Sequence, residues 1–112
     1  GSPTYASDLA EALGRLLQRE LTGVFHLTND GACSWYDFTR EILRRSGFGG
    51  TRVLPISSQE LARPARRPAY SVLANAAWAA AGEPRLRPWP EALADMLHAW
   101  RAMEPACPSP PR

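Results

Sequence analysis

Lysine is absent from the 112 residues of this chain, and all 13 of its basic residues are arginine. The absence excludes every function that needs a lysine within the chain, such as a P-loop, a Schiff base or a Tyr-x-x-x-Lys proton-transfer pair. Apolar residues form no run long enough to span a bilayer. The net charge of +2 is too small to predict a nucleic-acid-binding surface by itself.

Cysteine is scarce as well. The two cysteines, Cys33 and Cys107, form no metal-ligand or redox motif. We expect both to be free thiols in a reducing compartment, which predicts a cytoplasmic protein, and a disulfide between them is the alternative. With 45% hydrophobic residues, a chain of this length can bury one modest core. We therefore expect one domain, or a part of one.

Hydrophobic periodicity and turn residues predict helices that alternate with strands. The first predicted helix begins near Asp8, with Thr4 or Ser7 as alternative caps, and ends at Gly23. A second is capped by Ser34 and ends at Ser46-Gly47. A short third is capped by Asn75 and ends at Gly82, and a fourth has Pro90 in its first turn and runs to Met103. Val24–Thr28 and Val53–Ile56 are rich in β-formers and are the predicted strands.

The first predicted helix leads into the first predicted strand within a few residues, as in half of a crossover unit. Such a strand needs neighbouring strands to satisfy its backbone, and two short strands do not make a stable sheet alone. We therefore interpret residues 3–28 as the last helix and strand of a larger sheet. This interpretation makes the chain a C-terminal fragment.

Two adjacent arginines, Arg66 and Arg67, stand between Pro64 and Pro68. The prolines stiffen the backbone and favour extended conformations in the residues before them. Each guanidinium offers a planar fork of donors that suits a phosphate or a carboxylate. The pair therefore predicts an anion-binding loop, and a solvated basic loop is the alternative.

Several motifs in a fixed order resemble the C-terminal third of the dTDP-4-dehydrorhamnose reductases. They are GSPTYASDLA at residues 1–10, GVFHL at 23–27, SWYDF at 34–38, ARRPAYSVL at 65–73 and WPEAL at 89–93. That family belongs to the extended short-chain dehydrogenase/reductases, so the resemblance implies part of an α/β fold. Its implied parts are the last helix and strand of a Rossmann-like sheet (1–30), a small helical/β substrate-binding lobe (31–104) and a Pro-rich disordered tail (105–112).

The resemblance also implies how the chemistry is divided. In that family the N-terminal Rossmann part binds NADPH or NADH and carries the Tyr-x-x-x-Lys pair. The pair delivers a proton as hydride from the cofactor reduces the 4-keto group of dTDP-4-keto-L-rhamnose. Neither element occurs here, and Gly47-Phe48-Gly49-Gly50 follows a predicted helix, so it is not a dinucleotide turn. We expect this chain to bind the dTDP-sugar beside that Rossmann part, with no cofactor, metal, nucleic acid or membrane contact and no catalytic residue of its own.

Three residues are the predicted substrate contacts. Arg67 aligns with the arginine that holds the nucleotide diphosphate in related nucleotide-sugar epimerases. Arg66 either shares that contact or turns outward to an acidic neighbour. Trp35 is either a packing residue or a wall of the sugar pocket. Tyr70 stands where those epimerases carry an aspartate that touches ribose, and a phenol does not replace a carboxylate.

Other functions stay open beside this one. The chain could belong to a related nucleotide-sugar epimerase or reductase, or it could be a non-catalytic protein-interaction module of helices. A nucleic-acid patch is disfavoured, because no aromatic side chain interleaves the arginines on the polar faces of the helices. A homodimer also stays open.

Overall fold

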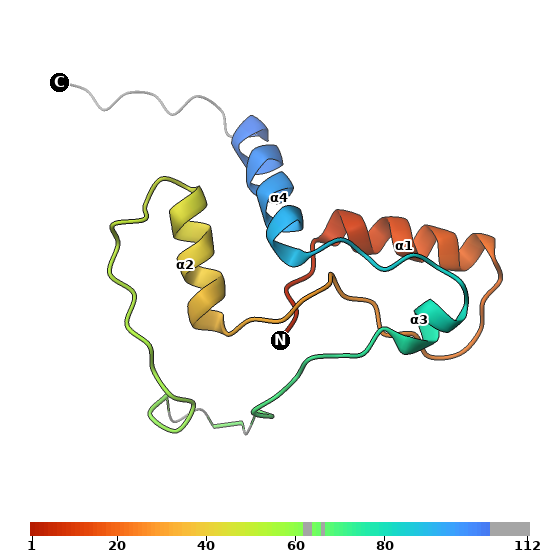
Figure 1. Cartoon of the computed structure of the whole chain (residues 1–112), viewed down its shortest axis with the longest axis horizontal. Coiled ribbons are helices and arrows are strands. Elements are labelled where there is room, and N and C mark those ends of the chain that lie inside the picture. The colour runs from red at the N-terminus through yellow and green to blue at the C-terminus, as the bar shows by residue number, and fades with distance from the viewer. Residues whose placement is uncertain (62–63, 66, 104–112) are drawn as a thin grey trace.

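Four α-helices make up the regular structure of the part that the computed structural model describes, residues 1–61, 64–65 and 67–103 (Figure 1). They are α1 (Ala6–Gln18), α2 (Trp35–Arg45), α3 (Ala76–Ala80) and α4 (Trp89–Met103). No helix in this part is long and apolar enough to cross a membrane. Arg66, Cys107 and the predicted tail lie outside the described residues.

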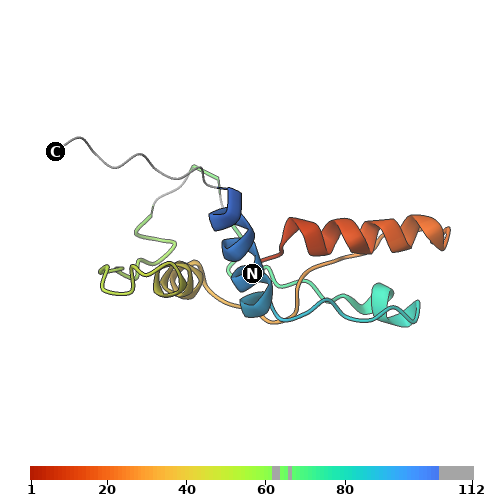
Figure 2. The same ribbon diagram turned by 90° about the horizontal axis from the view of Figure 1, so that it is seen from above.

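The molecule is flat and open. Its extents are 59 × 39 × 23 Å, with α1 and α2 toward opposite ends and α4 between them (Figure 2). Its radius of gyration is 17.7 Å, whereas a compact domain of this length has about 13 Å. The helices therefore enclose little interior of their own.

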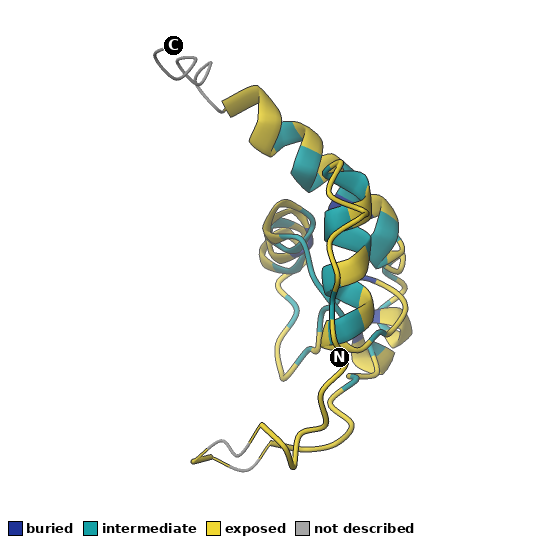
Figure 3. Cartoon of the chain, turned by 90° about the vertical axis from the view of Figure 1, so that its left-hand side faces the viewer, coloured by how far each residue is buried: buried dark blue, intermediate teal, exposed yellow. Residues whose placement is uncertain are grey.

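Few apolar side chains are buried among the residues that the structure describes. They are Ala12, Trp78, Ala92 and Leu93, and most residues of the ribbon in Figure 3 are coloured as exposed or intermediate. Many large apolar side chains are exposed instead: Leu13, Leu17, Val24, Trp35, Phe48, Leu54, Ile56, Leu61, Tyr70, Leu73, Trp100 and Met103. Exposed apolar surface on this scale is typical of a face that contacts another part of a protein.

Helix α2 begins where the sequence predicts. The Asp37 amide donates to Ser34 Oγ at 3.0 Å, and the Ser34 amide donates to Asp37 Oδ2 at 3.4 Å, so the two residues form a capping box. Helix α4 likewise begins at Trp89, with Pro90 in its first turn as predicted. Both starts depend on contacts within a few residues of the chain.

Helix α1 differs from the prediction at both ends. It begins at Ala6, its N-cap Tyr5 has no side-chain cap bond, and Asp8 lies inside the first turn. It ends at Gln18 because Glu20 takes a left-handed conformation (φ 50°), with the Leu21 amide bonded to the Leu16 carbonyl. The predicted stop at Gly23 is therefore wrong.

The two predicted strands are wrong for the described chain. Neither Val24–Thr28 nor Val53–Ile56 forms a strand, and the bridge described between separate segments joins Asp30 to Pro88. A strand exists only through backbone hydrogen bonds to a neighbour, and neither run makes such bonds to another segment of the described chain. The chain is therefore helical with extended connections, not an α/β unit by itself.

Aromatic contacts join the elements around the centre of the molecule. Phe38 of α2 packs edge-to-face on Trp89 of α4, with ring centroids 5.7 Å apart. Trp78 of α3 is fully buried, meets Phe25 edge-to-face at 6.5 Å, and donates its indole N–H to the Pro84 carbonyl at 2.9 Å. These contacts hold α2, α4 and the segment after α1 as the frame of the site.

Candidate functional site

A cleft of about 370 Å³ lies between the N-terminal segment and the start of α2, and we call it the Trp35 cleft. Its lining combines aromatic rings with hydroxyl groups: Gly1, Ser2, Pro3, Thr4, Cys33, Ser34, Trp35, Phe38 and Ser71. Apolar walls with a few polar groups are typical of small-molecule sites. The cleft joins three segments that are far apart in the sequence.

Trp35 presents its ring to this cleft from the first position of α2. Its side chain is 83% exposed, and its ring meets Phe38 edge-to-face at 6.1 Å. The Ser34 capping box fixes the start of the helix and with it the position of Trp35. A large aromatic face that is held on one side and open on the other is suited to stacking on a sugar or a base.

The N-terminal wall of the cleft, which we define as residues 1–5, is bonded to the chain near α2. The Gly1 amino group donates to the Cys33 carbonyl at 3.0 Å, and the Cys33 amide donates to the Gly1 carbonyl at 3.0 Å. Burial raises the pKa of the Cys33 thiol, so the thiol is neutral near pH 7. The lining residues on this side of the cleft thus contribute no charged side chain.

A second cleft of about 330 Å³ shares Ser2 with the first. Its other lining residues come from the segment after Leu27, from the segment that leads into the first residue of α3, and from Arg85. The sequence predicts that Asn75 caps α3, but its side chain makes no cap bond. It donates instead to the Thr28 carbonyl at 2.9 Å. That bond ties two walls of the second cleft together.

The predicted substrate contacts fall in different places. Trp35 lines the Trp35 cleft, as does Ser71. Arg67 is exposed on the connection that leads to Ser71 and is not among the residues that line the Trp35 cleft. It has no ion-pair partner in the described part of the chain. Arg66 lies outside the described residues. The roles of all three in substrate binding stay predictions.

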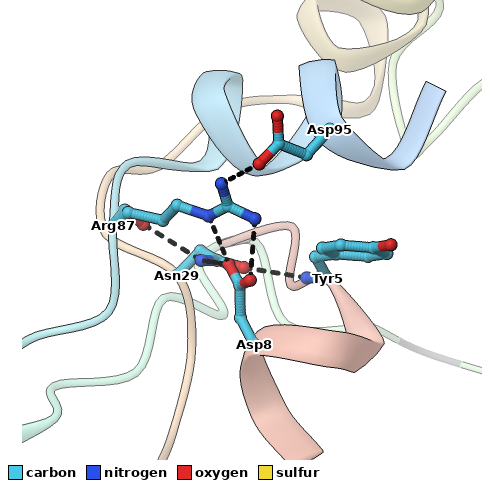
Figure 4. Close-up of polar contacts among 5 residues, drawn as sticks. All are labelled: Tyr5, Asp8, Asn29, Arg87 and Asp95. Atoms are coloured by element: carbon cyan, nitrogen blue, oxygen red, sulfur yellow. Dashed lines mark hydrogen bonds and ion pairs between the residues drawn. The ribbon is translucent and has the colours of Figure 1, made fainter. Parts of the chain in front are cut away.

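A polar cluster that ranges from the buried Asn29 to the exposed Asp95 lies behind the N-terminal wall, and we call it the clamp (Figure 4). It consists of Asp8, Asn29, Arg87 and Asp95, and Asn29 is buried with only 1% of its surface exposed. The Asn29 amide group donates to Asp8 Oδ2 at 2.7 Å and to the Arg87 carbonyl at 3.0 Å, and its oxygen accepts from the Tyr5 amide at 2.8 Å.

Arg87 completes the clamp through its guanidinium. It donates to both Asp8 oxygens, at 2.9 and 2.8 Å, and also to Asp95 of α4. The bonds from Arg87 hold the pKa of Asp8 below its usual value against the opposing effect of burial. Sequence reasoning missed this cluster, because Asp8 and Arg87 are 79 residues apart and no local pattern links them.

Among the described residues, no group of three or more His, Cys, Asp or Glu side chains is arranged to hold a metal ion. The family model of the RmlD substrate binding domain matches residues 1–102. The chain belongs to that family. The match extends over the N-terminal wall, α2 and α4, so both the Trp35 cleft and the clamp are parts of an RmlD substrate binding domain.

The domain has curated relatives that are much longer than itself. It is 44% identical over 97 residues to the spore coat polysaccharide biosynthesis protein SpsK of Bacillus subtilis, covering 87% of this chain and 33% of that protein. It is 44% identical over 100 residues to the dTDP-4-dehydrorhamnose reductase of Mycobacterium tuberculosis, covering 88% and 33%. The chain thus spans about a third of these relatives' length.

A solved structure confirms the relationship at the level of fold. The dTDP-4-dehydrorhamnose reductase of Bacillus anthracis in complex with NADP superposes with a TM-score of 0.85 at 32% identity. The match covers 88% of this chain and 35% of that one. The resemblance predicted from the motifs is confirmed, and the chain matches part of a short-chain reductase fold.

Proposed function

We propose that this RmlD substrate binding domain is the substrate-binding part of a dTDP-4-dehydrorhamnose reductase. That enzyme reduces the 4-keto group of dTDP-4-keto-L-rhamnose with NADPH or NADH, and its product supplies cell-surface polysaccharide synthesis. The observation that carries the proposal is the match of the family model over residues 1–102, with 44% identity to a reductase of that name. The proposed location is the cytoplasm.

The proposal divides the reaction between two parts of the enzyme. This chain has no lysine, so the proton-transfer pair belongs to a Rossmann part, and we assign the cofactor turn to the same part. The chain's share is to bind and orient the dTDP-sugar, and it has no catalytic residue. Exposed apolar residues of α1 and of the segment after it, namely Leu13, Leu17 and Val24, support docking against that part.

The proposed ligand contacts come from the start of α2, from the N-terminal wall and from the connection that leads to Ser71. The Trp35 ring stacks on the sugar or the base within the Trp35 cleft, where Ser71 and Thr4 offer hydroxyl groups. Arg67, four residues before Ser71, holds the diphosphate, and Arg66 is a second candidate for that contact. Charge supports this assignment, because the diphosphate is the one strongly anionic part of the ligand.

A chimeric enzyme tests the proposal. This chain replaces the matching third of the Mycobacterium tuberculosis reductase, and NADPH oxidation is followed with dTDP-4-keto-L-rhamnose. We expect turnover by the chimera and none by the 112-residue chain alone, because the hydride site and the proton relay lie outside it. The unaltered reductase is the matched control. A folded chimera that binds NADPH but neither binds the dTDP-sugar nor turns it over contradicts the proposal.

An interaction module is the second candidate, and the amount of exposed apolar surface favours it. Such a module would keep a stable partner while its Trp35 cleft bound no nucleotide sugar. Titration of the chain with dTDP-glucose separates the two candidates, since only the reductase part is expected to bind it. Light scattering on the chimera then shows whether it forms a homodimer, for which the exposed end of α4, with Trp100 and Met103, offers an apolar surface.

A further inference from the structure

We infer that Asn29 and Arg87 are positioning residues that hold the N-terminal wall of the Trp35 cleft in its place. Both belong to the clamp, and neither lines that cleft. Their effect on ligand affinity rests on the proposed function, whereas their effect on the wall does not. The inference comes from the arrangement of four bonded side chains behind one wall of the site (Figure 4).

Asn29 has one orientation that satisfies all of its side-chain bonds. Its two N–H donors meet the acceptors Asp8 Oδ2 and the Arg87 carbonyl, and its oxygen meets the donor Tyr5 N–H. A reversed amide would set its oxygen against two acceptors and its nitrogen against a donor. Since the side chain is buried, water does not replace these bonds, and the Tyr5 amide is held in one place.

Arg87 fixes the position of Asn29 in turn. Its carbonyl accepts from the Asn29 side chain and from the Asp30 amide, the latter at 3.0 Å, and the Trp89 amide donates to the Asp30 carbonyl at 2.9 Å. Its guanidinium ties α1 to α4 through Asp8 and Asp95. The Asn29–Asp30 segment is therefore bonded on several sides to the start of α4.

The wall is consequently attached at two points. At one end Gly1 pairs with Cys33 through two bonds of 3.0 Å. At the other end the Tyr5 backbone amide donates to the Asn29 side-chain oxygen. The Asn29 backbone amide donates to Thr4 Oγ1 at 3.4 Å. Three of the residues between these points, Ser2, Pro3 and Thr4, line the cleft. Loss of the clamp frees one end of the wall while Trp35 keeps its own cap.

Asn29→Asp converts the clamp into a pH-dependent one. The new carboxyl oxygen takes the place of the N–H donor beside Asp8 Oδ2, so two carboxylates meet and one pKa of the pair rises, while the Arg87 guanidinium bonded to Asp8 opposes part of that rise. The protonated pair is bonded below that raised pKa, and the bond is lost as the pH rises through it. We expect dTDP-glucose affinity to be about tenfold weaker than that of the wild type at pH 7.5, with part of the loss recovered at pH 5.

Two further variants serve as controls. Asn29→Leu has no titrating group, so its affinity is expected to be weak at both pH values. Glu83→Gln breaks the ion pair with Arg19 at the far end of α1, away from the wall, and is expected to bind as the wild type does. dTDP-glucose is the probe because none of its groups titrates between pH 5 and 8. The comparison of one folded variant at two pH values remains informative even if Asn29→Leu does not fold.

Hydrogen exchange of the free chain gives a second readout that needs no ligand. At pH 7.5 the Asn29→Asp variant is expected to lose protection at the Tyr5 amide, relative to its intrinsic rate, while the Cys33 amide at the other attachment point stays protected and Glu83→Gln changes neither. If the wild type binds no dTDP-glucose but protection changes as expected, the proposed function fails and the clamp stands. Unchanged protection in Asn29→Asp, or altered protection with unchanged dTDP-glucose affinity, overturns the positioning role.

Discussion

Replacement of Arg67 tests the proposed diphosphate contact most directly. Its guanidinium is exposed in the free chain and has no ion-pair partner among the described residues, so Arg67→Ala removes no structural bond described there. The fold should therefore keep its stability. A change in ligand affinity then reports on the ligand contact itself.

The size of the effect follows from the kind of bond. A hydrogen bond to a charged group contributes about 1.5–3 kcal/mol, which corresponds to roughly a ten- to hundredfold change in affinity. Because Arg67 is exposed before the ligand binds, solvent screens part of this contribution, and we expect a loss near tenfold. Arg67→Lys should recover only part of it, since an ammonium group lacks the planar fork of donors.

The assay is a titration of dTDP-glucose against the chain and of both dTDP-glucose and NADPH against the chimera. Arg52→Ala is the matched control, because Arg52 is another exposed arginine on a connection outside the helices. We expect the loss for Arg67→Ala to shrink as salt is raised and NADPH affinity to stay unchanged. Equal losses for both ligands, or the same dTDP-glucose affinity in Arg67→Ala and Arg52→Ala, would falsify the diphosphate contact.

Three further predictions concern the frame around the site. Bonds from Arg44, and then from Arg45, lower the pKa of Glu41 to about 2. Its stabilising effect is therefore present above its ordinary pKa and is lost as the pH falls toward 2. Urea unfolding should show that Glu41→Gln lowers the free energy of unfolding at pH 6 and lowers it less at pH 2.5. Ser34→Ala removes the α2 capping box and should cost about 1 kcal/mol of unfolding free energy, and a cost near zero in urea unfolding counts against the cap. Trp78→Ala should cost about 3–5 kcal/mol because the ring is fully buried; thermal unfolding by circular dichroism measures it, and a melting temperature equal to that of the wild type contradicts the burial.

Helix starts that depend on neighbouring residues were predictable. The capping box of α2 joins Ser34 to Asp37, three positions apart, and proline in the first turn of α4 needs no distant partner. Such signals act through backbone bonds within one turn, so the rest of the fold does not change them. The order of motifs along the chain likewise predicted the family, because motif spacing is a property of the sequence itself.

Sequence reasoning was wrong where an element depended on a partner or on an unusual backbone conformation. Val24–Thr28 has the composition of a strand, but a strand needs a neighbour for its backbone bonds, and no other segment of the described chain pairs with it through its backbone. Helix α1 ends early because Glu20 takes the left-handed backbone conformation that stops a helix, and glutamate rarely adopts that conformation. Neither outcome is encoded in local composition.

The amino-acid sequence by itself thus determined the family, the starts of α2 and α4, and the absence of a catalytic lysine. Only the tertiary structure decided that Trp35 and Ser71 share one cleft and that Asp8, read as a helix cap, is bonded to Arg87 and Asn29 instead. The physical reason is sequence separation. These bonds span between 21 and 79 residues and form only when the chain brings their partners together, so no window of sequence contains them.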